Sequence, residues 1–185
     1  MRARWINQAA PRILRRMTQL PAFKTARLVL RQRSRLDTDG CMEMDRDPDV
    51  HRFLSLPWSD PTRHRAFVEA RTHGPYPVGQ GYWTILFRDA FVGWILLMPL
   101  DTIGPEIEIG WRLRRDAWGQ GLATEAAAPI LDHGLRTLGL AHVIADIAPE
   151  NVGSRRVAEK LGMRPGELVD TPHGPAIRYL AARDP

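Results

Sequence analysis

The chain has 185 residues, a formal net charge of +5 and one cysteine, Cys41. A chain of this length can form one domain that buries a core unaided, the single cysteine excludes an internal disulfide framework, and neither a zinc-spaced Cys/His cluster nor a secretory signal is visible. The longest apolar run, Phe91–Leu100, is far shorter than the ~20 residues of a membrane-spanning helix. From the single cysteine and the missing signal and Cys/His cluster, we expect a cytoplasmic protein that needs no metal.

The excess positive charge lies at the N-terminus. Residues 1–16 contain five arginines and no acidic residue, which equals the whole net charge. A basic patch on the folded domain is therefore not indicated, and contact with nucleic acid or a ribosome would come only from this tail. Three interpretations of residues 1–16 stay open: a dispensable leader before a start at Met17, a peripheral helix, and an arm that contacts nucleic acid or a ribosome. We expect residues 1–22 to be a basic extension, which could be disordered, and residues 23–185 to form the domain.

The first half of the domain reads as one strand followed by short helices. Residues 27–33 alternate between apolar and polar types, which predicts the first strand. Helix starts are expected at Asp37, at Asp47–Asp49 and after Ser59–Thr62. The glycines and prolines of residues 74–81 predict a loop, which could also gate a substrate.

The second half alternates strands and helices. A hairpin of residues 82–87 and 91–98, followed by a strand over 106–113, should form an antiparallel meander. Apolar residues at helical spacing predict a helix after residue 121, in which Pro129 should cause a bend. Because this helix is a crossover, a strand over 143–147 should be parallel to 106–113. A helix over 151–161 and a strand over 176–181 complete the pattern.

The stretch from Glu108 to Ala126 places a glycine-bearing turn between an apolar strand and an alanine-rich helix. Gly119 and Gly121 let the backbone approach a ligand, and the N–H groups of the first helical turn point outward with the positive end of the helix dipole. This arrangement predicts a diphosphate site. The segment lacks the Lys-Ser/Thr pair of a P-loop and the three widely spaced glycines of a dinucleotide fold.

Two motifs carry a family resemblance. The turn Trp118–Glu125 and the downstream segment Asn151–Met163 resemble the GNAT superfamily of acyl-CoA-dependent N-acyltransferases, in the branch of the ribosomal-protein alanine N-acetyltransferases. The resemblance covers roughly residues 25–183. It implies an α+β fold, one domain with a mixed, mostly antiparallel sheet splayed at its centre and helices on both faces. It also implies acetyl-CoA as cosubstrate, without a metal.

The resemblance further implies a set of cofactor-binding residues. In this family the pantetheine arm inserts between two splayed strands, and Ile109–Leu113 occupies the first of them. The expected cofactor contacts are Ile109, Gly110, Trp111, Leu113, Trp118, Gly119, Gln120, Gly121, Leu122, Ala123, Thr124, Asn151 and Ser154. Two positions depart from the family pattern. Asp116 stands where an Arg or Gln is usual, and Ala158 stands where many members have a tyrosine that acts as general acid.

The chemistry needs a base for the amine and a proton for the departing thiolate. The resemblance places Glu108 where substrate and acetyl group meet, so Glu108 is the preferred base, and Ser154 is the best remaining acid. Ordinary alternatives stay open: Glu106 and Glu108 could be solvated strand residues paired with arginines, and Asn151 could be a helix N-cap. Trp58, Tyr82, Trp83 and Glu106 are the candidates for contacting the acceptor.

The expected function is transfer of an acetyl group from acetyl-CoA to a primary amine, on a protein N-terminus or a small molecule, by direct attack in a ternary complex. The alternative is a catalytically weak CoA-binding sensor or interaction module. No membrane partner is expected, and a homodimer is left open.

Overall fold

The computed structural model describes residues 19–53, 60–100 and 104–183. Within these residues eight strands form one sheet, in the order β1-β2-β3-β4-β5-β6-β8-β7. The strands are β1 (Phe23–Lys24), β2 (Leu28–Gln32), β3 (Gly81–Phe87), β4 (Ala90–Pro99), β5 (Ile107–Leu113), β6 (His142–Ile147), β7 (Arg164–Thr171) and β8 (Gly174–Ala182). The helices are α2 (Thr38–Met44), α3 (Pro48–His51), α4 (Pro61–His73), α5 (Leu122–Asp132) and α6 (Val152–Lys160), with short 3-10 turns at Arg35–Asp37 and Arg115–Ala117.

Strands β1 to β5 form the expected antiparallel meander. The β3–β4 hairpin turns at Arg88 and Asp89, which both have positive φ. Two consecutive positive φ values match the twist of the flanking strands, as in the favoured two-residue hairpin turns.

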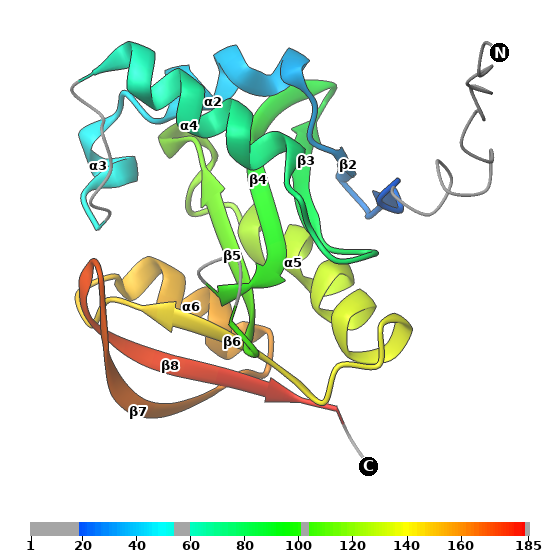
Figure 1. Cartoon of the computed structure of the whole chain (residues 1–185), viewed down its shortest axis with the longest axis vertical. Coiled ribbons are helices and arrows are strands. Elements are labelled where there is room, and N and C mark those ends of the chain that lie inside the picture. Colours follow the sequence, from blue (N-terminus) through cyan, green and yellow to red (C-terminus); the bar gives the residue numbers. More distant parts are fainter. Residues whose placement is uncertain (1–18, 54–59, 101–103, 184–185) are drawn as a thin grey trace, which may run out of the picture.

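The sheet opens between β5 and β6. These strands are parallel, as predicted, but they are paired in register only at Glu108 and Ile144. The β4–β5 ladder, by contrast, runs from Gly93–Leu113 to Pro99–Ile107. Figure 1 shows β5 running at a steep angle to β6 and β8. The mixed sheet with a central splay confirms the expected α+β fold.

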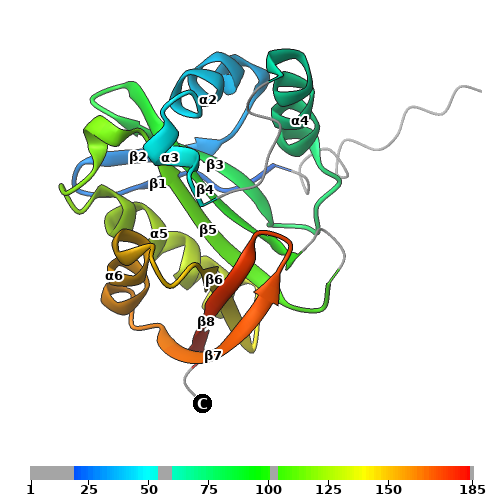
Figure 2. The ribbon, with the colours of Figure 1, turned by 90° about the vertical axis from the view of Figure 1, so that its left-hand side faces the viewer.

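Helices cover both faces of the sheet (Figures 1 and 2). The larger core cluster lies between the sheet and α5 and includes Trp83, Ile109 and Ile130. A second cluster on the other face packs Cys41, Val68 and Trp94 between the sheet and helices α2 to α4. Odd-numbered side chains of β5 therefore face α5, and even-numbered ones face the opposite side.

Three features were not predicted from the sequence, namely strand β1, strand β7 and a π-helical turn after α5. Strand β7 was not predicted, because Arg164-Pro165-Gly166 has poor strand propensity; the proline is tolerated because β7 lies at the sheet edge. Helix α5 continues through Pro129 to Asp132, and the chain then widens into a π-helical turn over His133–Thr137.

The packed part of the chain begins before Phe23. Leu20 is buried in the larger core, and its N–H donates to Gln32 Oε1 at 3.1 Å. Pro21 contributes its carbonyl to the Trp83 indole N–H at 2.8 Å. The predictions for residues 1–16 fall outside the described residues. Across the described ranges, no helix is long and apolar enough to cross a membrane.

Candidate functional site

The turn before α5 has the backbone that its glycines predict. Gly119 and Gly121 have φ values of 72° and 75°, a left-handed conformation that other residues adopt only with strain. Gly121 is the N-cap of α5, without a side-chain cap, and its carbonyl accepts from the Glu125 N–H at 3.1 Å. The N–H groups of Leu122, Ala123 and Thr124 precede that bond and point out of the helix end. A Cβ on Gly119 would meet no atom within 4 Å, so the space at the turn is open.

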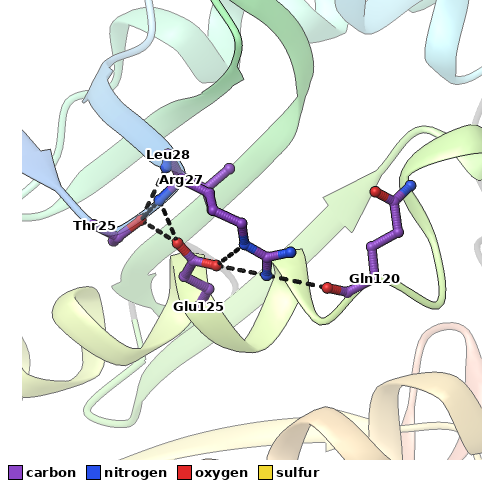
Figure 3. Close-up of polar contacts among 5 residues, drawn as sticks. All are labelled: Thr25, Arg27, Leu28, Gln120 and Glu125. Atoms are coloured by element: carbon purple, nitrogen blue, oxygen red, sulfur yellow. Dashed lines mark hydrogen bonds and ion pairs between the residues drawn. The ribbon is translucent and has the colours of Figure 1, made fainter.

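A polar cluster ties this turn to the start of β2 (Figure 3). Arg27 donates from Nε to Glu125 Oε2 at 2.6 Å and from Nη2 to the Gln120 carbonyl at 3.0 Å. Glu125 Oε1 accepts from the Thr25 hydroxyl at 2.6 Å and from the Arg27 backbone N–H at 2.9 Å. Partial burial acts to raise the pKa of Glu125, but these hydrogen bonds leave it below its usual value.

Sequence reasoning did not identify Arg27 as part of the site. Arg27 and Glu125 are 98 positions apart, and neither stands out in its local pattern. Asp116, which stands where an Arg or Gln is usual in the family, is engaged by a neighbouring residue. Its carboxylate pairs with Arg114 at 2.9 Å, and the hydrogen bond from Arg114 lowers the pKa of Asp116.

Two further residues of the turn have structural hydrogen bonds. The Trp118 indole N–H donates to the Leu113 carbonyl at 2.9 Å, and the Gln120 side-chain amide donates to the Asp116 carbonyl at 2.9 Å. These bonds hold the turn against the end of β5. The Gln120 side chain is therefore engaged within the turn.

The strand β5 offers its backbone rather than most of its side chains. Ile109, Leu113 and Leu122 are almost completely buried in the α5-side core, so their side chains cannot reach a ligand. Gly110 has a packing reason of its own, because a Cβ there would lie 3.2 Å from Leu96 Cγ. If these positions bind a cofactor, they do so through backbone N–H and C=O groups.

Trp111 and Ser154 meet across the opening. The partly buried Trp111 indole N–H donates to Ser154 Oγ at 3.2 Å, which links β5 to the first turn of α6. Asn151 caps α6, since its Oδ1 accepts from the Ser154 N–H at 3.1 Å. Asn151 therefore acts as the N-cap of α6, and its hydrogen bond to the Ser154 N–H also fixes the backbone at Ser154.

The two glutamates of this strand differ in their surroundings. Glu108 is partly buried and lies at the one β5–β6 register pair, opposite Ile144, where the strands begin to diverge. Glu106, just before β5, contacts His142 through Oε2 and Nε2 at 2.6 Å, and both side chains are about one third exposed. Glu108 is therefore the glutamate at the mouth of the opening.

The aromatic acceptor candidates do not line one surface. Trp83 is fully buried on the α5 side, whereas Tyr82 is buried on the opposite face beneath the Arg33 guanidinium, 3.7 Å from the ring centroid. Neither side chain presents an open wall to an acceptor. Trp58 lies outside the described residues.

A buried charged cluster lies on the face covered by α2 to α4. Asp45 accepts from Arg112 Nη1 at 2.9 Å and contacts His64 Nε2 at 3.0 Å. Arg112 and Glu108 are both even-numbered residues of β5 and so lie on the same face of the sheet. His64 and Asp45 are 19 positions apart, and Asp45 and Arg112 are 67 apart, so local sequence patterns do not indicate this cluster.

A groove of about 730 Å³ runs along α5 from Thr124 to Arg136, beside the end of α6 and Arg183. Of the predicted site residues only Thr124 borders it, so the groove is not assigned to the reaction. Among the described residues, no group of three or more His, Cys, Asp or Glu side chains could hold a metal ion.

Comparison with known proteins agrees with this geometry. A family model described as an acetyltransferase (GNAT) domain matches residues 27–164. The FsC-acetyl coenzyme A-N(2)-transacetylase of Aspergillus fumigatus is 30% identical over 155 residues, which cover 77% of this chain and 65% of that protein. A GNAT-family acetyltransferase from Bacillus anthracis has a TM-score of 0.72 at 26% identity, covering 88% of this chain and 98% of that one. The RimL ribosomal L7/L12 α-N-protein acetyltransferase, solved with coenzyme A, shares the fold, with a TM-score of 0.71 at 15% identity over 86% of this chain and 96% of that one.

Proposed function

The chain belongs to the GNAT acetyltransferase family, and from this membership we propose that it transfers the acetyl group of acetyl-CoA to a primary amine in a direct ternary complex. The observation that carries the proposal is the opening between β5 and β6. It begins at Glu108, and the open glycine turn follows at the end of the same strand.

We place the diphosphate of acetyl-CoA at the turn Gly119–Gly121. There the uncapped N–H groups of residues 122–124 and the positive end of the α5 dipole favour an anion. The pantetheine arm then follows the backbone of β5 into the opening, because the strand edge beyond Glu108 has no registered partner on β6. This path delivers the thioester between Glu108 and Ser154.

In the reaction the amine nitrogen attacks the thioester carbonyl, the C–N bond forms and the C–S bond breaks. Glu108 accepts a proton from the amine, directly or through water. Ser154 donates its hydroxyl proton to the departing thiolate and regains a proton from water or from the protonated Glu108, so that the products are the amide and the free thiol of CoA. Because the Trp111 N–H occupies a lone pair of Ser154 Oγ, the hydroxyl hydrogen of Ser154 can be donated elsewhere. Thioesters are activated, so positioning supplies most of the rate enhancement.

Direct transfer is supported by the state of the one cysteine. Cys41 is 1% exposed, and burial raises the pKa of its thiol to about 11. The thiolate is the nucleophilic form of cysteine, so this residue is unsuited to hold the acetyl group as a covalent intermediate.

A binding-only function is the second candidate. It is favoured by Ala158, which is fully buried and stands where many members of the superfamily have a tyrosine that acts as general acid. Release of free thiol from acetyl-CoA in the presence of amines separates the two functions, since a sensor would bind acetyl-CoA without turnover.

Two measurements test the proposed function. Acetyl-CoA should raise the melting temperature by mass action, whereas NADH and ATP should not; no shift at millimolar acetyl-CoA would refute the cofactor assignment. A thiol-release screen with protein N-terminal peptides and small amines should then identify the acceptor class. We propose that the acceptor is one of these two classes.

A further inference from the structure

We propose that Arg27 is a positioning residue for the diphosphate of acetyl-CoA, which acts by fixing the glycine turn and by cancelling the charge of Glu125. The inference rests on the proposed placement of the cofactor at that turn. It assigns to the start of β2 a role in cofactor affinity, in a chain where Asp116 is engaged by Arg114.

The first argument concerns the shape of the turn. Gln120 lies between two glycines in left-handed conformations, so the Gly119-Gln120-Gly121 backbone has wide freedom when nothing holds it. Among the described residues, Arg27 is the side chain that donates to the Gln120 carbonyl. Its Nη2 also lies 3.8 Å from the position of a Cβ on Gly121. Arg27 thus fixes the Gln120 carbonyl and restricts the backbone of the turn that precedes the N–H groups of α5.

The second argument concerns charge. Glu125 lies at the N-terminal turn of α5, and its pKa is lowered, so its carboxylate is ionised at neutral pH. An unpaired carboxylate there would repel a diphosphate. Arg27 cancels it through Nε and Nη2, each 2.6 Å from Glu125 Oε2. The Arg27 side chain is 43% exposed, so it lies at the surface beside the turn.

The competing explanation is that Arg27 only fastens β2 to α5. A fastening role would lower the melting temperature and would disturb all reactions of the enzyme together. A role in diphosphate positioning raises the Kd for CoA, leaves kcat at saturating acetyl-CoA nearly unchanged and spares a donor without phosphates.

The test compares Arg27→Gln with Arg27→Lys, Glu125→Gln and the double variant Arg27→Gln/Glu125→Gln. Arg65→Gln is the matched control. Arg65 lies on α4 and also pairs with a carboxylate, that of Asp39 on α2, at 2.6 Å. Calorimetry gives the Kd for CoA, steady-state assays give kcat with acetyl-CoA, and kcat/KM is measured with S-acetylpantetheine. Melting temperature reports folding.

Arg27→Gln should raise the Kd for CoA about tenfold, while kcat at saturation and kcat/KM for S-acetylpantetheine stay within about twofold of wild type. The double variant should recover part of the lost affinity, because it removes the uncompensated carboxylate. Arg27→Lys keeps the positive charge but loses the planar guanidinium with its several donors, so its Kd for CoA should lie between those of the wild type and Arg27→Gln. If Arg27→Gln fails to fold, the same three quantities, Kd, kcat and kcat/KM, are compared between Arg27→Lys and the wild type.

Equal losses with both donors, a fall in kcat matching the rise in Kd, or an unchanged Kd for CoA would overturn the inference. Failure of the proposed function is a separate result, because the wild-type protein would then release no thiol from acetyl-CoA with any amine, whatever its Kd for CoA. The Arg65→Gln control should match the wild type in every assay.

Discussion

At the scale of single residues, the two glutamates Glu106 and Glu108 are close in sequence but have different surroundings. Glu106 contacts His142, whereas Glu108 lies where β5 and β6 part. Only the second position borders the opening into which the thioester would extend. The register therefore supports Glu108, rather than Glu106, as the proposed base.

Glu108→Gln should lower kcat/KM most strongly near neutral pH, because the amine is then mostly protonated and needs a base. A general base typically contributes ~10²–10⁴-fold. The deficit should shrink as the pH rises and free amine becomes abundant, which a pH–rate profile would measure. A loss of the same size at every pH would point to binding or structure instead.

Trp111→Phe should lower kcat about fivefold, since it removes one hydrogen bond of ~1 kcal/mol to Ser154 while keeping an aromatic ring in place. The KM for acetyl-CoA should change little. Ser154→Ala should cause a loss at least as large, and adding Trp111→Phe to it should cost nothing more, because the two residues act as one unit. Additive losses would show that Trp111 acts independently of Ser154.

At the scale of an element, the turn into α5 combines backbone strain with ligand access. Gly119 and Gly162 make a matched pair: both have positive φ, 72° and 79°, and a Cβ at either would meet no atom within 4 Å. They differ in place, since Gly162 follows the end of α6. A substitution at each separates strain from contact with the ligand.

Gly119→Ala and Gly162→Ala should each destabilise the fold by about 1–2 kcal/mol, the cost of a left-handed alanine. Only Gly119→Ala should also weaken acetyl-CoA binding, because its methyl group enters the space proposed for the diphosphate. Urea denaturation and calorimetry measure the two effects. Equal affinities for the two variants would argue against the proposed diphosphate position.

At the scale of the whole molecule, the splay divides the sheet into two parts. One part is the meander of β1 to β5, and the other is the β6, β8 and β7 group. The chain passes between them through α5, and their strands are in register at Glu108 and Ile144, with side-chain contacts at Glu106–His142 and Trp111–Ser154. The opening therefore lies where the meander meets the C-terminal strands. A ligand that fills it adds backbone contacts that neither part makes alone.

Acetyl-CoA should consequently slow hydrogen exchange in the part of β5 that follows Glu108 and in the first turn of α5. The exposed β7–β8 turn at Thr171–Gly174 exchanges by local opening and should be unaffected. Mass spectrometry of peptides with and without acetyl-CoA measures both regions. Protection confined to other segments would contradict insertion of the pantetheine arm beside β5.

The sequence by itself determined the features that depend on local chemistry. The glycines predicted the turn before α5, whose left-handed backbone the structure adds. Apolar patterning predicted the meander and its hairpin, and Asn151 was considered as a helix cap. Each of these depends on residues within a few positions of one another, where backbone sterics and hydrogen bonding act directly.

Only the tertiary structure decided which residues meet across the fold. Tyr82 and Trp83 are adjacent strand residues and so face opposite sides of the sheet, but only the fold shows that both sides are covered and that both side chains are buried. Arg27 reaches Glu125 across 98 positions. The physical reason is that strand order and register determine these contacts, and a strand's pattern of burial does not reveal which helix covers it or which distant side chain pairs with it.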